Sequence, residues 1–378
     1  MRIGILTYHW VYNFGANLQA LATCRYFADA GHEVSILNYR PPELVDAYAS
    51  RVPPAQAEAH ETFCDTYLPE SPVCRSEDDL VEFCNAAKLD AILTGSDAVF
   101  RLSAKLDRED TRFPNPFWLG WVSKNLQPTP ITASLAASAM GTNYYSLPFS
   151  ARRRIGAAIR NLTRVSVRDL WTQLMVLGMT WGRCWPSLCP DPIVVLEDVF
   201  KIPDTYTAEP SARRRQYVLL SAYEGMFSAD WLAEFVAAAH SQGLQVYSLP
   251  LPDSPASLAV DRELRLPLSP LEWYCWITSA AAFVGVRFHA LVCSMIGAVP
   301  FLAFDTYQTG RLRLSSKSYD LCSRAGVRSA CLDWRQKREL GPKKALALLL
   351  ASETDRASRY VKKAKQDYSR IAIGLLEH

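Results

Sequence analysis

The chain has 378 residues, of which 49% are hydrophobic and 21% are charged. This composition is close to the average of soluble globular proteins and excludes intrinsic disorder, a collagen-like fibre and a disulfide-stapled miniprotein as descriptions of the whole chain. The formal net charge of +3 is too small to indicate a nucleic-acid partner. At roughly 150 residues per domain, the length favours two domains.

The cysteines and the N-terminus bear on the cellular compartment. The ten cysteines are scattered, and the closest pair, Cys184 and Cys189, has no second pair or nearby histidines to complete a zinc site. Met1–Thr7 is too short an apolar run for a signal peptide. The most apolar segment, Cys275–Phe304, is interrupted by glycines, a proline and charged or polar residues, which disfavours a membrane span. We therefore expect a cytoplasmic protein with reduced thiols and no metal.

The first half of the chain predicts alternating strands and helices. Arg2–Thr7 is rich in β-forming residues, Asn17–Ala30 has apolar residues at helical spacing, and Glu33–Tyr39 is the next strand. Such a βαβ unit indicates a parallel sheet. Further strands are expected at Leu89–Asp97, Pro130–Ala136 and Leu162–Arg168, and a helix is expected over Asp169–Leu177.

A second α/β set follows an irregular connection over Trp181–Pro192, which contains three prolines. Strands are expected at 217–222, 245–249, 282–286 and 299–304, and helices at 229–241, 270–279 and 289–296. We therefore predict an α/β fold with two Rossmann-like domains facing a central cleft. The predicted segments are 1–188, 189–350 and a C-terminal helix, 351–378, that could pack back on the first domain.

Ligands of open α/β sheets bind beyond the carboxyl ends of the strands, and polar residues follow the first and third predicted strands. In Asn13–Ala20, glycine permits a tight turn, and the amides of a helix N-terminus attract anions or sugar hydroxyls. An ordinary loop and helix cap explains this segment equally well. Asp97, in Gly95-Ser96-Asp97, could accept a proton or bind sugar hydroxyls, although serine and aspartate are also common helix caps.

Two arginines end predicted strands. Arg168 could bind a carboxylate or phosphate through its planar guanidinium, or pair with a neighbouring acid. Arg287 is the only formally charged residue between Glu272 and Asp305, and His289 follows it. Because burying such groups is costly, we favour a function for both over a structural salt bridge, with Arg287 holding an anion and His289 transferring a proton.

Other charged residues are expected at the surface. Arg152–Arg154 and Arg213–Arg215 are predicted to be solvated, although either run could meet an acidic membrane surface. Four histidines are also predicted to be exposed: His32, His60, His240 and His378.

Taken in order, these segments resemble the polysaccharide pyruvyl transferase family. The resemblance is carried by Asn13-Phe14-Gly15-Ala16, Leu18-Gln19-Ala20, Gly31-His32-Glu33-Val34, Tyr39-Arg40-Pro41, Gly95-Ser96-Asp97, Ser166-Val167-Arg168-Asp169, Asp191-Pro192 and Val286-Arg287-Phe288-His289-Ala290. It implies an architecture like that of GT-B glycosyltransferases. It also implies transfer of the pyruvyl group of phosphoenolpyruvate to two hydroxyls of a saccharide, with release of phosphate and without a cofactor.

The resemblance also assigns roles to residues. His289 matches the proposed catalytic histidine, and Asp97 would orient or deprotonate the acceptor. The donor would be bound by Arg168, Arg287, Phe288 and Lys317. The acceptor would be bound by Asn13, Gly15, Asn17, Gln19 and Ser96. Because the acceptor would be a nucleotide-linked or lipid-linked saccharide, the protein could associate peripherally with the inner face of the cytoplasmic membrane.

Two departures from the family pattern leave alternatives open. Ala98-Val99-Phe100 replaces the usual Gln, hydrophobic residue and Trp, which leaves the identity of the acceptor open. Tyr307–Leu314 is inserted ahead of Lys317, which leaves the match of Lys317 to the family lysine open. A nucleotide-sugar-dependent glycosyltransferase on the same scaffold is the main alternative. A non-catalytic saccharide-binding protein is a further one.

Overall fold

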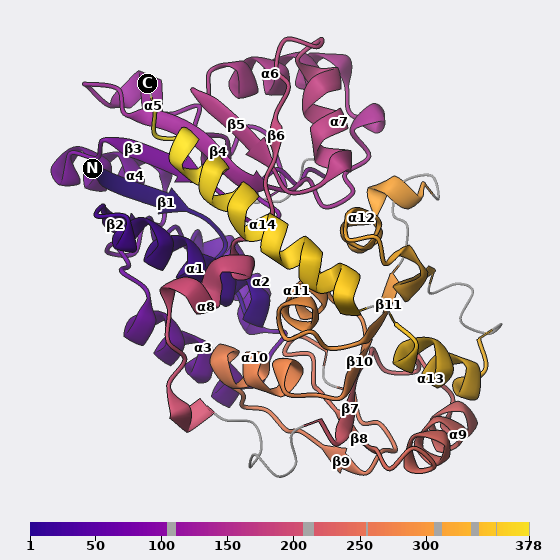
Figure 1. Ribbon diagram of the computed structural model, residues 1–378. Helices are drawn as coiled ribbons and strands as arrows, with labels where there is room; N and C mark the ends of the chain where they lie inside the picture. The colour runs from indigo at the N-terminus through magenta and orange to yellow at the C-terminus, as the bar shows by residue number, and fades with distance from the viewer. Residues whose placement is uncertain are drawn as a thin grey trace.

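The computed structural model describes residues 1–103, 111–206, 215–254, 256–305, 312–333, 340–352 and 354–377. Arg213, Arg214 and His378, and most of the Tyr307–Leu314 insertion, lie outside these ranges. The chain folds into two parallel sheets, each carrying helices (Figure 1). These are the two Rossmann-like domains predicted from the sequence.

The first sheet has the order β2-β1-β3-β4-β5-β6, and all of its strand pairs are parallel. Its central strands are apolar and fully buried, which explains why the sequence predicted them well. The strands are β1 (Arg2–Leu6), β2 (Glu33–Ile36), β3 (Ala91–Thr94), β4 (Ile131–Ala137), β5 (Arg164–Val167) and β6 (Ser187–Leu188). The last of these lies within the segment predicted to be irregular, which is a correction.

The helices of the first half are α1 (Phe14–Asp29), α2 (Pro42–Ala49), α3 (Pro54–Tyr67), α4 (Glu77–Ala87), α5 (Val122–Asn125), α6 (Phe149–Arg160) and α7 (Leu170–Met179). Helix α1 begins three residues before the predicted start because the side chain of Asn13 accepts hydrogen bonds from the amides of Gly15 and Ala16.

The second sheet is also parallel, in the order β12-β11-β10-β7-β8-β9. Its strands are β7 (Tyr217–Ser221), β8 (Gln245–Ser248), β9 (Arg262–Glu263), β10 (Ala282–Gly285), β11 (Phe301–Asp305) and β12 (Cys331–Asp333). Its helices are α9 (Ala229–His240), α10 (Pro270–Thr278), α11 (Phe288–Ile296), α12 (Lys317–Arg324) and α13 (Pro342–Leu350). A short helix, α8 (Leu196–Val199), lies in the connection between the two halves.

The C-terminal helix α14 (Thr354–Gly374) lies across both halves of the molecule (Figure 1). It packs on α11 of the second half. On the other side, the ring of its fully buried Tyr368 lies 5.1 Å from the ring of Tyr26 in α1, and the Tyr26 hydroxyl donates to the carbonyl of Ser369. Helix α14 therefore ties the two halves together.

The prediction that His60 is exposed is wrong, because helix α3 packs against the second half of the chain. The side-chain amide of Gln56 donates to the Leu268 carbonyl and accepts from the Leu268 amide, both over 2.8 Å. His60 is buried beside this contact, its ring 5.1 Å from that of Phe14, and burial lowers its pKa to about 4. In the part of the chain that the structure describes, no helix is both long and apolar enough to cross a membrane.

Candidate functional site

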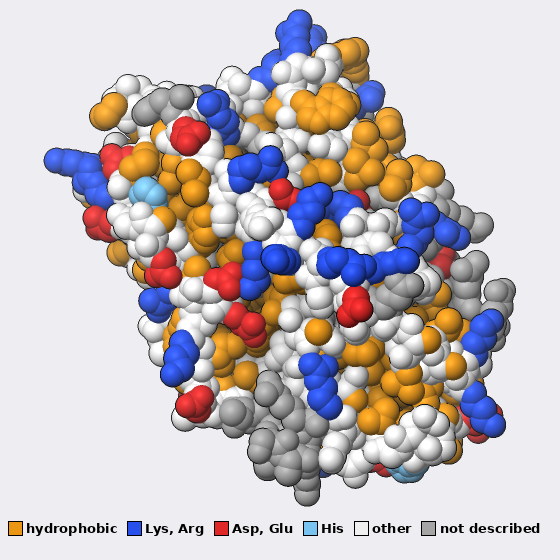
Figure 2. Space-filling view, in the orientation of Figure 1, with side chains coloured by type: hydrophobic (Ala, Val, Ile, Leu, Met, Phe, Trp, Pro, Cys, Tyr) orange, Lys and Arg blue, Asp and Glu red, His pale blue; other side chains and the backbone are white. Residues whose placement is uncertain are grey.

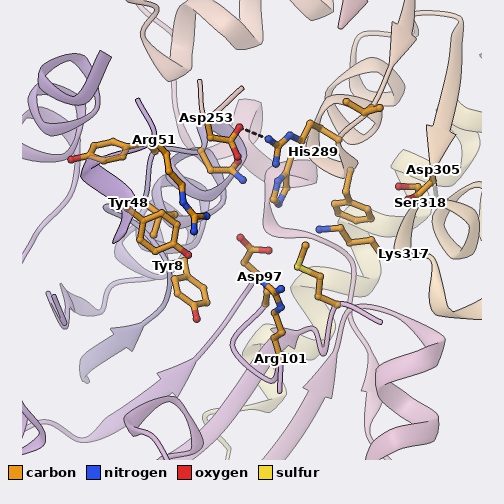
Figure 3. Close-up of a pocket in the computed structure, with 18 of the residues that line it drawn as sticks. Tyr8, Tyr48, Arg51, Asp97, Arg101, Asp253, His289, Asp305, Lys317 and Ser318 are labelled. Atoms are coloured by element: carbon orange, nitrogen blue, oxygen red, sulfur yellow. Dashed lines mark hydrogen bonds and ion pairs between the residues drawn. The ribbon is translucent and has the colours of Figure 1, made fainter. Parts of the chain in front are cut away.

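A cavity of about 580 Å³ lies between the carboxyl ends of the two sheets (Figure 3). Tyr8 follows β1 and Asp97 follows β3, while Arg287 follows β10. Figure 3 shows Tyr8, Tyr48 and Arg51 on one side of the cavity, and His289 and Lys317 on the other. Both halves of the chain therefore contribute to one site.

Arg168 joins the two sides of the site from beneath the cavity. Its side chain is fully buried and does not line the cavity. Its Nη2 donates to Asp97 Oδ1 over 3.0 Å, and its Nη1 donates to Asp191 Oδ2 over 2.7 Å. Arg168 Nη1 also lies 3.2 Å from His289 Nε2. The Arg168 side chain therefore holds two aspartates and the histidine, and it lies behind the cavity and not in it.

This arrangement fixes the orientation of the His289 ring. A guanidinium can only donate, so Nε2 of the neutral imidazole is the acceptor and the ring proton is on Nδ1. When the ring carries a second proton on Nε2, Asp191 Oδ2 lies 3.4 Å away to pair with it. Both protonation states therefore have a partner.

Charges around the cavity control the protonation of Asp97, Asp191 and Lys317. Burial raises the pKa of Asp97, but the opposing effects of Arg168, His289 and Lys317 outweigh it, so the pKa is lowered. Asp191 likewise has a lowered pKa, because His289 and Arg168 outweigh its burial. Burial, together with the positive charge of Arg168, lowers the pKa of Lys317. The cavity is thus lined by the Asp97 carboxylate and by a lysine that loses its proton more readily than usual.

Arg287 and Lys317 lie on the second half of the chain, at the starts of helices α11 and α12. Arg287 has a φ of 86°, an unusual value for a non-glycine residue, and pairs with Asp253. Lys317 opens α12 after the cap residue Ser316, whose hydroxyl donates to Asp305 Oδ2 over 2.6 Å. Strand β11, which ends at Asp305, therefore positions the lysine.

Phe288 contributes its ring to this site. The Cζ atom of Arg168 lies 4.5 Å from the ring centroid, and Lys317 Nζ lies 5.4 Å from it. Both are within the range of cation–π attraction. Phe288 therefore helps to hold the two cations beside His289.

Only Asn13 of the five residues expected to bind the acceptor lines the cavity. Asn17 and Gln19 are buried and hold the loop after β1, Asn17 by donating to the His9 carbonyl and Gln19 by donating to the Tyr8 carbonyl. Ser96 is also buried, and its carbonyl accepts a hydrogen bond from Thr7. Asn17, Gln19 and Ser96 thus shape the loops of the site, and their expected part in acceptor binding stays a prediction.

Gly15 has a different role, because His289 packs directly on it. A β-carbon at position 15 would lie 2.1 Å from both Cγ and Nδ1 of His289, far inside van der Waals contact. The glycine of the first motif therefore makes room for the histidine of the last. Position 15 packs against His289 and does not line the cavity.

Sequence reasoning missed several residues on the first-half side of the cavity: Tyr8, Tyr12, Tyr48, Arg51 and Arg101. Tyr48 and Arg51 are on or just after α2, a helix that begins at a proline without a polar side-chain cap. The Arg51 guanidinium lies 5.8 Å from the Tyr48 ring. Arg51 and Arg101 both line the cavity, and among the described residues neither is paired with an acidic side chain.

Within the described ranges, no group of three or more His, Cys, Asp or Glu side chains is arranged to hold a metal ion. The expectation of chemistry without metal or cofactor stays a prediction.

Comparisons with known proteins show what this chain resembles. Three solved structures illustrate the fold: spinosyn forosaminyltransferase SpnP (12% identity, TM-score 0.52, 100% of both chains covered), Arabidopsis thaliana UGT89C1 complexed with UDP-L-rhamnose (12%, 0.54, 100% of this chain and 99% of that one), and Methanocaldococcus jannaschii UDP-GlcNAc 2-epimerase (10%, 0.53, 97% and 100%). These similarities support the GT-B-like arrangement of the two domains. No curated protein matches the chain in sequence. The family model for polysaccharide pyruvyl transferase matches residues 13–307, and the chain therefore belongs to that family.

Proposed function

We propose that this protein transfers the pyruvyl group of phosphoenolpyruvate to two hydroxyls of a saccharide, forming a cyclic ketal and releasing phosphate. The observation that carries the proposal is the position of His289. This histidine belongs to the second half of the chain and is held by Arg168 of the first half and by Asp191 of the connection between the halves. It lines a cavity that is also lined by Arg287 and Lys317.

The donor would bind on the side of the second half. Phosphoenolpyruvate carries a carboxylate and a phosphate, which suit a guanidinium and an ammonium group. Arg287 and Lys317 both line the cavity there. Arg168 would act on the donor through its charge from behind Asp97 and His289 and not by contact.

The reaction would proceed by protonation and two additions. A proton from His289 adds to the methylene carbon of phosphoenolpyruvate, which becomes a methyl group and leaves a cationic carbon. One acceptor hydroxyl adds to that carbon and loses its proton to Asp97, whose lowered pKa keeps it ionised. The carbon–oxygen bond to phosphate then breaks, and the departing phosphate takes the proton held by Asp97. A second hydroxyl of the saccharide adds to the same carbon and gives its proton to His289, which restores the acid. The products are the ketal and inorganic phosphate.

The acceptor would bind on the side of the first half. Tyr8 and Tyr48 line the cavity there, and their side chains would contact a sugar ring. Arg51 and Arg101 lie on the same side and would bind the phosphate of a nucleotide-linked or lipid-linked saccharide. Ala98, from the segment that departs from the family pattern, also lines this wall, so that the departure would lie beside the acceptor.

A nucleotide-sugar-dependent glycosyltransferase is the second candidate, and the overall fold is the observation that favours it. The donor requirement separates the two functions. We expect phosphate release only when phosphoenolpyruvate and a saccharide acceptor are both present, and a mass spectrum in which the saccharide has gained one pyruvate ketal. Transfer from a nucleotide sugar, with no response to phosphoenolpyruvate, would instead establish the second candidate.

Donor binding is expected to weaken as the pH rises, and the weakening should begin at a lower pH than it would with a lysine of ordinary pKa. The pKa of Lys317 is lowered, so as pH rises this side chain loses its charge below the usual value of about 10.4. The KM for phosphoenolpyruvate should therefore rise with pH in the unmodified protein. In Lys317→Met the KM should be high and no longer show this rise, whereas Lys317→Arg should keep a low KM to higher pH.

The measurement is a set of KM values across pH, with Lys343→Met as the matched control because Lys343 is exposed on α13. If the KM for phosphoenolpyruvate depended on pH in Lys317→Met as it does in Lys343→Met and in the unmodified protein, Lys317 would have no part in donor binding.

A further inference from the structure

Four aromatic side chains are exposed on one part of the first half, around the start of α6 and the loop after α7. Tyr145, Phe149, Trp181 and Trp185 have 64%, 55%, 68% and 72% of their surface exposed. Large apolar groups are normally covered in a soluble domain, and exposed clusters of them mark interaction surfaces. With Arg152 and Arg153, these side chains form what we call the aromatic–arginine patch.

Contacts join three members of the patch, Phe149, Trp181 and Arg152. The rings of Phe149 and Trp181 lie 6.2 Å apart in an edge-on arrangement, and the Cζ atom of Arg152 lies 5.8 Å from the Phe149 ring. Tyr145 precedes Phe149 by four residues, and Trp185 follows Trp181 by four. The segments before α6 and after α7 therefore meet here.

The packing of α6 explains why these groups face outward. The helix buries Ala151, Ile155 and Ile159 on its inner face. It approaches α7 so closely that a β-carbon at Gly156 would lie 2.0 Å from the Met179 carbonyl oxygen. The inner face is thus fully used, and the aromatic side chains at the helix start remain available to a partner.

The exposed charged side chains of this region are all basic. Between Tyr144 and Pro190 the only acidic residue is Asp169, which is buried at the start of α7. Exposed arginines of the same stretch are Arg153, Arg154, Arg160, Arg164 and Arg183. Figure 2 shows hydrophobic side chains gathered over α6 and α7 at the top of the molecule, with basic side chains around them.

We propose that the aromatic–arginine patch docks the protein on the surface of an anionic lipid bilayer. Tryptophan, tyrosine and phenylalanine rings are favoured at the boundary between headgroups and acyl chains, where a ring can be buried while its polar edge stays hydrated. Arginines around them are attracted to anionic headgroups. The absence of exposed acidic residues from this stretch of sequence fits a negatively charged surface as the partner.

Docking would bring the cavity close to the bilayer. Met140 lines the cavity and Tyr145 of the patch follows it five residues later, so one short segment joins the two surfaces. The docking proposal itself does not depend on the identity of the donor. Docking on the bilayer would give a lipid-linked acceptor direct access to the site.

The test is flotation of the full-length protein with vesicles of phosphatidylcholine alone or mixed with phosphatidylglycerol. We expect binding to the mixed vesicles, weaker at high salt, and a blue shift of tryptophan emission. Both Phe149→Ala/Trp181→Ala/Trp185→Ala and Arg152→Glu/Arg153→Glu should weaken binding by about tenfold or more. Helix α13 supplies matched controls: Leu348→Ala/Leu350→Ala and Lys343→Glu/Lys344→Glu, at exposed positions, should bind as the unmodified protein does.

Several outcomes would overturn the proposal: no binding to mixed vesicles, equal binding without anionic lipid, or an equal loss in the α13 controls. Retention on nucleic acid without vesicle binding would assign the patch to a different polyanion. The thermal unfolding midpoint of each variant reports whether it is folded, and Arg152→Lys/Arg153→Lys should retain binding. Transfer to a soluble acceptor should be unchanged by the patch variants, so failure of docking and failure of the proposed reaction are observed separately.

Discussion

His289→Ala is expected to lower kcat for pyruvyl transfer by about 10²–10⁴-fold, the usual contribution of a positioned general acid. The histidine is 4% exposed and lies beside Arg168 and Asp191, which stay paired with each other when its ring is removed. The free energy of unfolding should therefore change much less than the rate does. Phosphate release at saturating phosphoenolpyruvate and acceptor, together with urea unfolding, measures the two effects. An unchanged rate of phosphate release would exclude His289 as the acid.

Gly15→Ala tests the same assignment without altering the histidine itself. The new methyl group would overlap the ring of His289, so the ring must move, and displacement of a catalytic group by about 1 Å can cost 10²-fold in rate. Gly120→Ala is the matched control, because a β-carbon there meets no atom within 4 Å. Full activity of Gly15→Ala would mean that the position of the His289 ring is unimportant to the reaction.

Much of the fold could be predicted from the sequence because its strands are buried on both faces. Such strands appear as short apolar runs between turn residues, as in Ala91–Thr94 and Ala282–Gly285. Helices α2, α3, α4, α6 and α12 were missed. Helices α2, α3 and α6 begin at or directly after a proline and have no side-chain cap, so the usual signal of a helix start is absent. Helices α4 and α12 do carry serine caps, Ser76 and Ser316, and that signal was overlooked.

The candidate site was predicted only in part, because strand ends are visible in a sequence and contacts between distant segments are not. Asp97, Arg287 and His289 follow strands and do line the cavity. The inward direction of Arg168 depends on Asp191, 23 residues away, and on His289, 121 residues away. Tyr48 and Arg51 reach the cavity only because α2 packs where it does, and no local pattern marks them.

The largest effect on stability is expected for Arg168→Met. The substitution leaves the side chains of Asp97 and Asp191 without the buried guanidinium that now binds both. Removing one partner of a buried ion pair typically costs about 3–5 kcal/mol in the free energy of unfolding. The free energy of unfolding of Arg168→Lys should lie between those of the unmodified protein and Arg168→Met, because a single ammonium group cannot reproduce the planar contacts to two carboxylates and His289.

The pH dependence of this loss identifies its cause. In the unmodified protein, Asp97 and Asp191 have lowered pKa values, so their contribution is present above the unfolded-state pKa of about 3.9 and is lost only in stronger acid. Without Arg168, which is the largest of the charges that oppose the burial of Asp97, the pKa of Asp97 should rise above its unfolded-state value, so the folded variant loses stability as pH rises through it. In urea unfolding, the free energies of unfolding of the unmodified protein and of Arg168→Met should therefore differ by an amount that grows from about pH 4 to pH 7. Adding Asp97→Asn to Arg168→Met should restore part of the stability at pH 7, since one uncompensated charge is removed. A difference that did not change with pH, and no recovery in the double variant, would show that Arg168 stabilises the site by packing and not by its charge.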